Sequence, residues 1–191
     1  MLSTLLRDMQ ACQVCAADLP LGPRPVLRAS KTARVLIIGQ APGTKVHASG
    51  KPWDDRSGDR LRNWMQIEAD TFYDENRIAI MPMGFCYPGV DPCGGDLPPH
   101  PECAPLWHQS LLDHMPRIGL ALIIGSCAQA HYLKGMRRKT MTATVATWRD
   151  YPDRLIPLPH PSWRNTAWLG RNPWFETNLL PDLRARLRAH L

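Results

Sequence analysis

The sequence predicts an α/β fold: a three-layer α/β/α sandwich around a central, mainly parallel sheet of four strands. Four apolar runs carry this prediction, at residues 35–38, 78–81, 120–124 and 155–158, and each stops at a turn marked by glycine, proline or a polar residue. Runs that are aliphatic throughout are typical of strands buried on both faces of a parallel sheet. Helical patterns separate the runs, as parallel crossover connections require. With 191 residues and 44% hydrophobic content, we expect one domain over residues 1–191.

Apolar spacing and capping residues place the helices of the two outer layers. Residues 3–11 form a short amphipathic pattern, whereas residues 44–58 are polar and predict a loop. Leu61, Trp64 and Met65 recur at helical spacing, and Asp55 or Ser57 is placed to cap that helix. The other helices are expected over residues 102–115, from a cap at Ser126 to Leu133, around residues 141–148, and from Asn172 onward with a bend at Pro181.

The connection from Tyr87 to Pro101 contains five prolines and three glycines and has no pattern of secondary structure. A structureless connection of this length is uncommon in a compact domain unless it is functional or held in place. Cys86 and Cys103 stand at its two ends. A site built from these thiols would explain how the connection is held.

The net charge of +6 is unevenly distributed along the chain. Residues 1–136 contain 13 basic and 13 acidic residues, whereas residues 137–191 contain 10 basic and 4 acidic ones. A basic face suggests a polyanionic partner, nucleic acid above all. The alternative is that Arg184, Arg186 and Arg188 only solvate a terminal helix.

Composition also indicates the cellular compartment in which the protein works. No apolar run approaches the roughly 18 residues that span a bilayer, and residues 1–9 have no signal-peptide core. We therefore expect a cytoplasmic monomer with no membrane partner. In that compartment, the six cysteines are expected to be free or metal-bound rather than disulfide-bonded.

The residues that follow the strands are the candidates for chemistry, because ligands of parallel sheets bind at the carboxyl ends of the strands. The turn from Gly39 to Gly43 has two glycines that let its backbone N–H groups approach a ligand, although a plain turn is the alternative. Phe85 and Cys86 follow the second strand, and Ser126 and Cys127 follow the third.

The fourth strand ends at His160, which stands between two prolines that stiffen its backbone. A rigid imidazole there can donate a hydrogen bond to a leaving group, while Ser162 and Arg164 can hold a phosphate. Trp163, Trp168 and Leu169 add apolar groups to a basic loop, a composition expected of a wedge that enters a base stack. The alternative is a packed core histidine with tryptophans that cover the sheet.

Four cysteines form a further constellation, because one Cys-x-x-Cys pair and two distant cysteines can complete a four-thiolate site. They are Cys12, Cys15, Cys86 and Cys103. Thiolates bind either zinc or an iron–sulfur cluster, and the spacing does not separate the two. Independent buried thiols are a third possibility, and Cys93 could replace either of its neighbours in the set.

Cys127 allows a different reading, because a cysteine at the start of a helix that follows a strand is a place where thiolate nucleophiles occur. Paired with His160, it would make a Cys/His hydrolase without dependence on DNA. The sequence offers neither an oxyanion loop nor a third member for such a site.

Taken in chain order, the motifs resemble the uracil-DNA glycosylase superfamily, most closely its iron–sulfur branch, families 4 and 5. The matching segments extend over nearly the whole chain: Cys12 and Cys15, Gly39 to Gly43, Gly50-Lys51-Pro52-Trp53, Cys86, Cys103, Ile124-Gly125 and His160 to Ser162. Each motif alone is weak, but seven in the correct order are a strong signal. The segment from His160 to Thr166 is closer to the family 5 pattern.

The resemblance implies a monofunctional DNA glycosylase that flips a deaminated base, uracil or a related one, out of DNA and hydrolyses its N-glycosidic bond. It implies that the turn 39–43, with Gln40, positions the water, that His160 stabilises the departing base, and that the four cysteines hold a 4Fe–4S cluster. We expect Asp54 to help place the water. The residues implied at the base are Gly39, Ala41, Pro42, Gly43, Trp53 and Phe85, with Trp53 stacking on it. Those implied on the DNA are Ser162, Trp163, Arg164 and Asn165.

The chain departs from the family pattern in two places. Gln40 stands where the branch has Glu, and Ala41 where the best-known members have the water-activating Asp, so the turn contains no carboxylate. Asp54 and Asp55 are substitutes, although an N-cap is the expected role of Asp55. Pro82 stands where the branch has the Asn that reads uracil. The alternative function is a nucleic-acid binding protein of the same fold that lacks catalysis.

Overall fold

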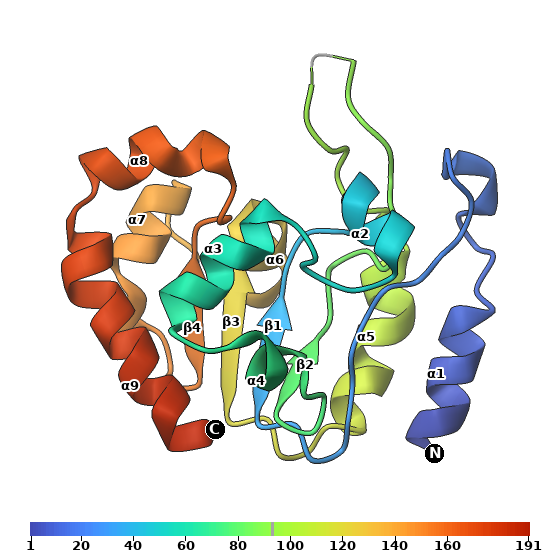
Figure 1. Cartoon of the computed structure of the whole chain (residues 1–191), viewed down its shortest axis with the longest axis horizontal. Coiled ribbons are helices and arrows are strands. Elements are labelled where there is room, and N and C mark those ends of the chain that lie inside the picture. Colours follow the sequence, from blue (N-terminus) through green and yellow to red (C-terminus); the bar gives the residue numbers. More distant parts are fainter. Residues whose placement is uncertain (93) are drawn as a thin grey trace.

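The computed structural model describes residues 1–92 and 94–191 and places a four-stranded sheet at the centre of the molecule (Figure 1). Its strands are β1 (Val35–Ile38), β2 (Ile78–Ile80), β3 (Leu120–Ile124) and β4 (Leu155–Leu158). They are ordered β2-β1-β3-β4, and every neighbouring pair is parallel. The predicted sheet is confirmed, and it is wholly parallel.

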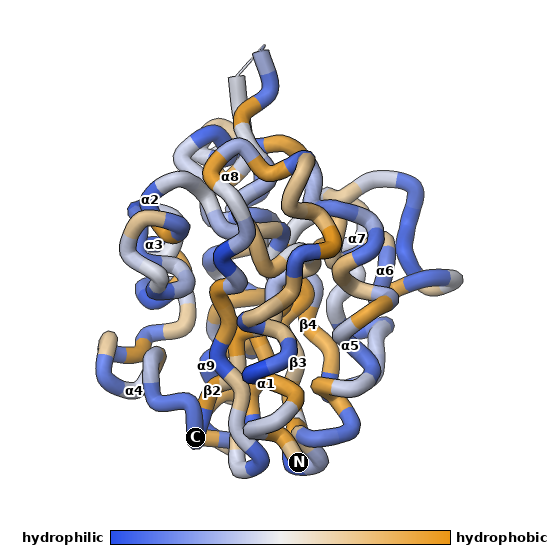
Figure 2. Tube along the Cα trace, turned by 90° about the vertical axis from the view of Figure 1, so that its right-hand side faces the viewer, coloured by the Kyte–Doolittle hydropathy of each residue, from blue (hydrophilic) through white to orange (hydrophobic). Residues whose placement is uncertain are grey.

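Strand residues alternate between two apolar cores, one on each face of the sheet. Val35 and Ile37 face the first core, and Leu36 and Ile38 face the second. Because both faces are covered, the strands run as hydrophobic segments through the middle of the molecule (Figure 2). The three-layer α/β/α sandwich is confirmed.

Helices from different parts of the chain cover the two faces. The first core is covered by α3 (Arg56–Met65), α4 (Ala69–Tyr73), α7 (Met141–Ala146), α8 (Thr166–Arg171) and α9 (Leu180–His190). The second is covered by α1 (Leu2–Gln10), α5 (Cys103–Asp113) and α6 (Gly125–Tyr132). Short 3₁₀ turns occupy Ala16–Asp18, Trp148–Asp150 and Trp163–Asn165.

Three local predictions have different outcomes. Asp55 caps α3, because its Oδ1 accepts a hydrogen bond from the backbone N–H of Gly58 at 2.8 Å, as expected. Ser126 does not cap α6: the helix begins one residue earlier, at Gly125, whose φ of +82° lets the chain turn directly from strand to helix. Residues 44–58 are not all loop, because Thr44–Ser49 form α2 and bury Val46.

The last helix begins with an irregular segment. A π-helical stretch over Phe175–Leu179 leads into α9, and Pro181 lies in the first turn of α9. Proline lacks the N–H of a regular helical bond, and the first turn tolerates this loss. The irregularity expected at Pro181 therefore lies in the turn before it.

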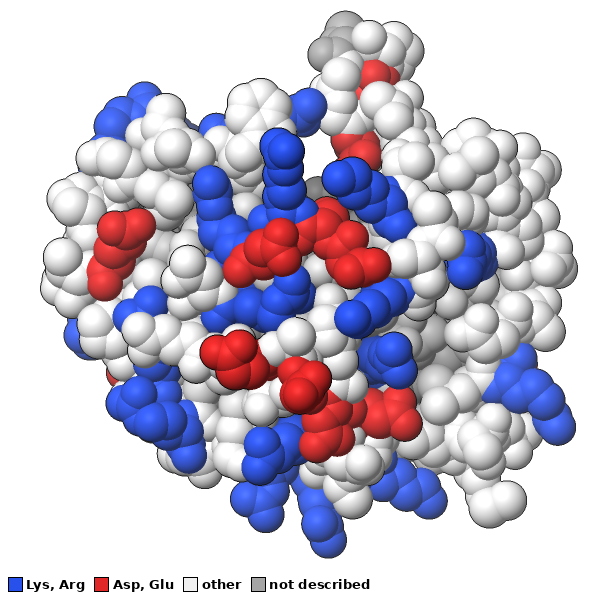
Figure 3. Space-filling view, viewed as in Figure 1, with Lys and Arg blue, Asp and Glu red and all other residues white. Residues whose placement is uncertain are grey.

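Two arginines of α9 hold this helix against the rest of the fold. Arg184 donates from Nε to the carbonyl of Trp64 at 2.9 Å, and Arg186 pairs with Asp182 at 2.9 Å and donates to the carbonyl of Asp153. The face seen in Figure 3 mixes Lys and Arg with Asp and Glu. These two members of the C-terminal basic excess therefore take part in holding the fold together. Within the described residues, none of the helices is long and apolar enough to cross a bilayer.

The connection between β2 and α5 projects from the end of the molecule where α2 and α8 also lie (Figure 1). An antiparallel bridge joins Val90 to Asp96, and the N–H of Leu97 donates to the carbonyl of Gly89 at 2.9 Å. We call the described residues of this connection, 87–92 and 94–101, the projecting loop.

Candidate functional site

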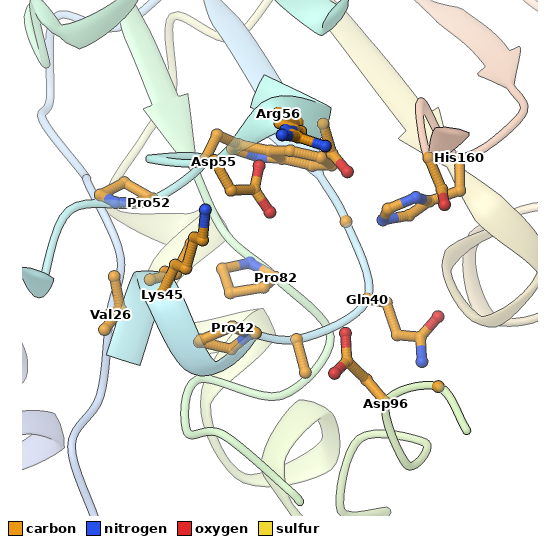
Figure 4. Close-up of a pocket in the computed structure, with 18 of the residues that line it drawn as sticks. Val26, Gln40, Pro42, Lys45, Pro52, Asp55, Arg56, Pro82, Asp96 and His160 are labelled. Atoms are coloured by element: carbon orange, nitrogen blue, oxygen red, sulfur yellow. The ribbon is translucent and has the colours of Figure 1, made fainter. Parts of the chain in front are cut away.

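A pocket of about 440 Å³ lies at the carboxyl ends of the strands (Figure 4). Its walls come from the turn 39–43 after β1, from Pro82 after β2, from residues between Pro52 and Ser57, from the projecting loop, and from His160 to Arg164 after β4. Strand order reverses at β1, which is where parallel sheets place their ligands. Of the strand-end candidates, the turn 39–43 and the segment from His160 to Arg164 meet here, whereas those that follow the second and third strands, Phe85, Cys86, Ser126 and Cys127, do not line the pocket.

Trp53 forms one wall of the pocket and faces His160, with ring centroids 5.6 Å apart and planes inclined by 33°. Its backbone has φ +57°, an uncommon conformation for a bulky residue. Its carbonyl accepts hydrogen bonds from the hydroxyl of Tyr73 at 3.2 Å and from Arg62 at 3.4 Å. These contacts hold the strained residue in place.

Two glycines make room for Trp53. A Cβ on Gly39 would lie 2.8 Å from Cζ2 of the Trp53 ring, and a Cβ on Gly58 would collide with the Trp53 carbonyl. The ring therefore packs directly on the backbone of the first turn. The Trp53 ring is therefore fixed as one wall of the pocket.

His160 is held by its backbone as well as by its flanking prolines. Nδ2 of Asn165 donates to the His160 carbonyl at 2.7 Å, and Arg60 donates to the Ser162 carbonyl at 2.9 Å. Burial lowers the pKa of His160 from its ordinary value, and the negative charges of Asp55 and Asp96 partly oppose this effect. At neutral pH the imidazole is neutral and offers one N–H donor and one acceptor.

The structure corrects the expected place of the carboxylates. Asp54 is exposed and does not line the pocket, because the left-handed turn at Trp53 directs the chain away from it. Asp55 lines the pocket but caps α3. Asp96, on the projecting loop, lines the pocket and was missed by sequence reasoning, since its only local signal is the preceding pair of glycines.

Gln40 lines the pocket as expected, but its amide is engaged. Nε2 of Gln40 donates to the carbonyl of Leu97 at 3.3 Å and so ties the first turn to the projecting loop. The side-chain carbonyl oxygen remains as the acceptor that a water molecule can use. Ala41, Pro42 and Gly43 also line the pocket.

Three of the four residues predicted to meet DNA line the pocket. Ser162, Trp163 and Arg164 line the pocket mouth, and Trp163 is 69% exposed. Asn165 is not among the lining residues, because its side chain holds the carbonyl of His160. Trp168 is buried in the first core and donates from Nε1 to Thr142, so it is no wedge. Lys45 and Arg56 add cations to the rim that the sequence did not single out.

The four predicted cysteines line one small cavity of about 30 Å³ on the side of α1 and α5. All four are free thiols, and Cys103 accepts a hydrogen bond through Sγ from the backbone N–H of Phe85 at 3.4 Å. Burial raises the pKa values of Cys86 and Cys103, that of Cys103 to about 12. The structure thus brings the set together. Cys93, the proposed substitute, lies outside the described residues.

Phe85 belongs to this cavity and not to the pocket. Its side chain is 2% exposed and packs in the second core, with its ring 5.5 Å from that of His108. The expected contact with a substrate is therefore wrong. The chain after β2 directs Pro82 to the pocket and Phe85 to the opposite core.

Cys127 is not brought to the pocket that contains His160. It lies in the first turn of α6 and packs against the second core. A Cys127/His160 hydrolase therefore lacks its geometry.

The comparison with protein families agrees with the strand-end motifs. Residues 28–184 match the family model of the uracil DNA glycosylase superfamily. The match includes the turn 39–43, Trp53 and His160, and leaves Cys12 and Cys15 outside it. Members of this superfamily are in general glycosylases that act on DNA, which assigns a DNA glycosylase-type function in general terms. With a match over most of its length, the chain belongs to the uracil DNA glycosylase superfamily.

Proposed function

We propose that the protein is a monofunctional DNA glycosylase that excises a deaminated base, uracil or a related one, as the first step of base repair. The observation that carries the proposal is that Trp53 and His160 lie next to each other in one pocket, where Trp53 offers a flat ring and His160 an edge donor. A base extruded from a duplex needs both. Free thiols suit a reducing compartment, so we propose a cytoplasmic protein. We propose separately that it acts as a monomer.

The chemistry follows from the protonation state of His160. A base flipped into the pocket stacks on Trp53, and its glycosidic bond to C1′ of the sugar lengthens while negative charge develops on the base. A neutral imidazole N–H, kept neutral by burial, donates a hydrogen bond to that charge. Water then attacks the oxocarbenium-like C1′ and leaves an abasic site and the free base. Gln40 orients the water through its side-chain carbonyl.

The rim supplies the contacts that hold the opened duplex. Trp163 is exposed beside the pocket mouth and is placed to fill the gap that a flipped base leaves. Arg164, Lys45 and Arg56 supply positive charge for the backbone phosphates. Ser162 holds this segment in shape, since its hydroxyl accepts from the N–H of Arg164 at 3.3 Å.

Pro82 bears on which base is accepted. It lines the pocket at the position where the resemblance expects an amide side chain that reads uracil, and a proline ring has no donor. Its carbonyl is already engaged with Nε2 of His108 at 3.1 Å. We therefore propose a broader range of deaminated bases, with hypoxanthine and xanthine beside uracil.

The test is a cleavage panel. Purified protein is incubated with duplexes that carry a single uracil, hypoxanthine or xanthine, and abasic sites are then revealed by alkali. We expect strand breaks on at least one duplex, loss of them in H160A and W53A, and no effect of H114A, whose imidazole only bonds within α5. A monofunctional enzyme also forms no borohydride-trapped DNA adduct. Binding without breaks on any duplex would favour the non-catalytic binding protein.

We also propose that Cys12, Cys15, Cys86 and Cys103 bind a 4Fe–4S cluster. Tetrahedral zinc at about 2.3 Å from sulfur requires thiols about 3.8 Å apart. Among the described residues, one set of three ligand atoms lies within 4.8 Å of one another, and it comes from Cys15, His100 and Glu102. No three of the four thiols in the described part of the chain are that close together. The wider spacing favours the larger group, which would join the N-terminal segment to both ends of the projecting loop.

Spectroscopy and metal analysis decide between cluster and zinc. We expect a brown protein with absorbance at about 400 nm, as iron–sulfur proteins in general show, and about four irons per chain. C103S should lose the colour, whereas C127S, in a thiol outside the cavity, should retain it. One zinc per chain and no colour would contradict the proposal.

A further inference from the structure

Hydrolysis in this pocket needs a group that orients water and accepts its proton, and the turn 39–43 has no carboxylate. Glutamine at position 40 can orient water but cannot take a proton. Resting on the proposed glycosylase function, we look for this group among the other residues of the pocket.

The other ionisable groups near the turn are unsuitable. Asp54 is exposed outside the pocket. Asp55 lines the pocket, but its carboxylate receives the backbone N–H of Gly58 as the cap of α3, and losing that cap would cost about 1 kcal/mol of stability. Lys45 and Arg56 are cations, which repel an oxocarbenium ion instead of stabilising it.

Asp96 has the required position. Its Oδ2 lies 3.5 Å from the place of a Cβ on Gly43, so the carboxylate rests against the first turn. In Figure 4 it lies next to Gln40, with the imidazole of His160 farther along the same wall. No hydrogen bond or ion pair within the described part of the chain engages this carboxylate. It is thus available to a water molecule.

The projecting loop is held so that Asp96 stays at the turn. The bridge between Val90 and Asp96 closes the loop, and the bond from Gln40 to the carbonyl of Leu97 fixes the next residue. On the other side, a Cβ on Gly95 would lie 2.7 Å from the guanidinium of Arg164. Glycine at 95 therefore lets the loop approach the rim closely enough for Asp96 to enter the pocket.

We propose that Asp96 is the general base of the reaction and that Gln40 is a positioning residue for it. The water oxygen forms a bond to C1′ while the bond from C1′ to the base nitrogen breaks. The electron pair of the broken bond leaves with the base. The water proton passes to the Asp96 carboxylate and is returned to the departing base, so that a neutral base and an abasic sugar are released. The negative charge of Asp96 also stabilises the oxocarbenium-like sugar.

The test measures single-turnover excision on the best duplex of the cleavage panel. We expect D96N to lower the rate about 10²- to 10³-fold, within the range of general base catalysis. The thermal midpoint should be unchanged, because Asp96 is exposed on a loop. DNA affinity should not fall, because the substitution removes a negative charge from a basic rim. Added formate should partly restore D96A, which a merely structural role would not allow. D70N, in an exposed residue of α4, is the matched control.

The outcomes separate the two proposals. An active wild-type protein with D96N within threefold of it would overturn the role of Asp96 and leave the glycosylase function standing. A larger loss in D54N than in D96N would overturn it too. A change of preferred base in D96N, at an undiminished rate, would make Asp96 a reader of the base instead. Wild-type protein that excises no base would overturn the glycosylase function itself.

Discussion

Replacing Gly39 by alanine should slow excision without unfolding the protein. The added Cβ would lie 2.8 Å from Cζ2 of Trp53, whereas ordinary contacts of this kind are 3.4–4 Å, so the ring must move by roughly 1 Å. Because the ring lines the cavity and contacts His160, its shift changes the surface on which the base would stack. A misplacement of about 1 Å in an active site can cost about 10²-fold in rate, or about 2.7 kcal/mol of transition-state stabilisation.

The assay is single-turnover excision of the base that the cleavage panel identifies. G170A is the matched control, because nothing lies within 4 Å of its Cβ and Gly170 is in helix α8. In a W53F background the smaller ring removes the contact, so G39A should then cost only a few-fold. Full activity of G39A, or an equal loss in both backgrounds, would refute the packing of Trp53 on the first turn as the cause.

Three further predictions concern His160, His108 and Asn165. Because burial lowers the pKa of His160, the excision rate should stay constant from pH 8 down to about 6.5 and fall only below that; an inflection above 6.5 in the pH–rate profile would contradict a neutral imidazole. Burial also lowers the pKa of His108 to about 4, so the folded state binds fewer protons than the unfolded one, and stability should fall between pH 6.5 and 4 by about 3 kcal/mol. Urea unfolding measures this slope, which H108Q should largely remove. N165A should reduce kcat about tenfold with KM nearly unchanged, because it frees the His160 carbonyl and loses no contact with DNA; a rise in KM alone would indicate a DNA contact.

The sequence was sufficient for those parts of the fold that depend on local pattern. Continuous aliphatic runs predicted the strands because both faces of the sheet are covered, and their carboxyl ends had to bring the first turn and His160 together. Asp55 could be identified as a cap because capping depends on spacing along the chain. These inferences need no knowledge of how distant loops fold.

Other site residues depend on tertiary placement, for which the sequence has no local signal. The positive φ of Trp53 turns Asp54 away from the pocket, and nothing in the sequence announces that conformation. Phe85 and Trp168 are aromatic residues that follow strands, as site residues do, but their side chains pack in the two cores. Asp96 reaches the pocket only because a long loop folds back onto the first turn.

The two ends of the projecting loop connect the pocket to the cysteine cavity. Cys86 precedes the loop and Cys103 follows it, and both line the cavity, while Asp96 near its middle lines the pocket. Trp53 and His160, in contrast, are fixed by α3, Tyr73 and Asn165, which do not involve the loop. Loss of a group bound by the cysteines should therefore loosen Asp96 before it disturbs the stacking wall or the imidazole. On this reasoning the stacking and hydrogen-bonding half of the pocket belongs to the rigid sheet, and the half that activates water depends on how firmly the loop is anchored.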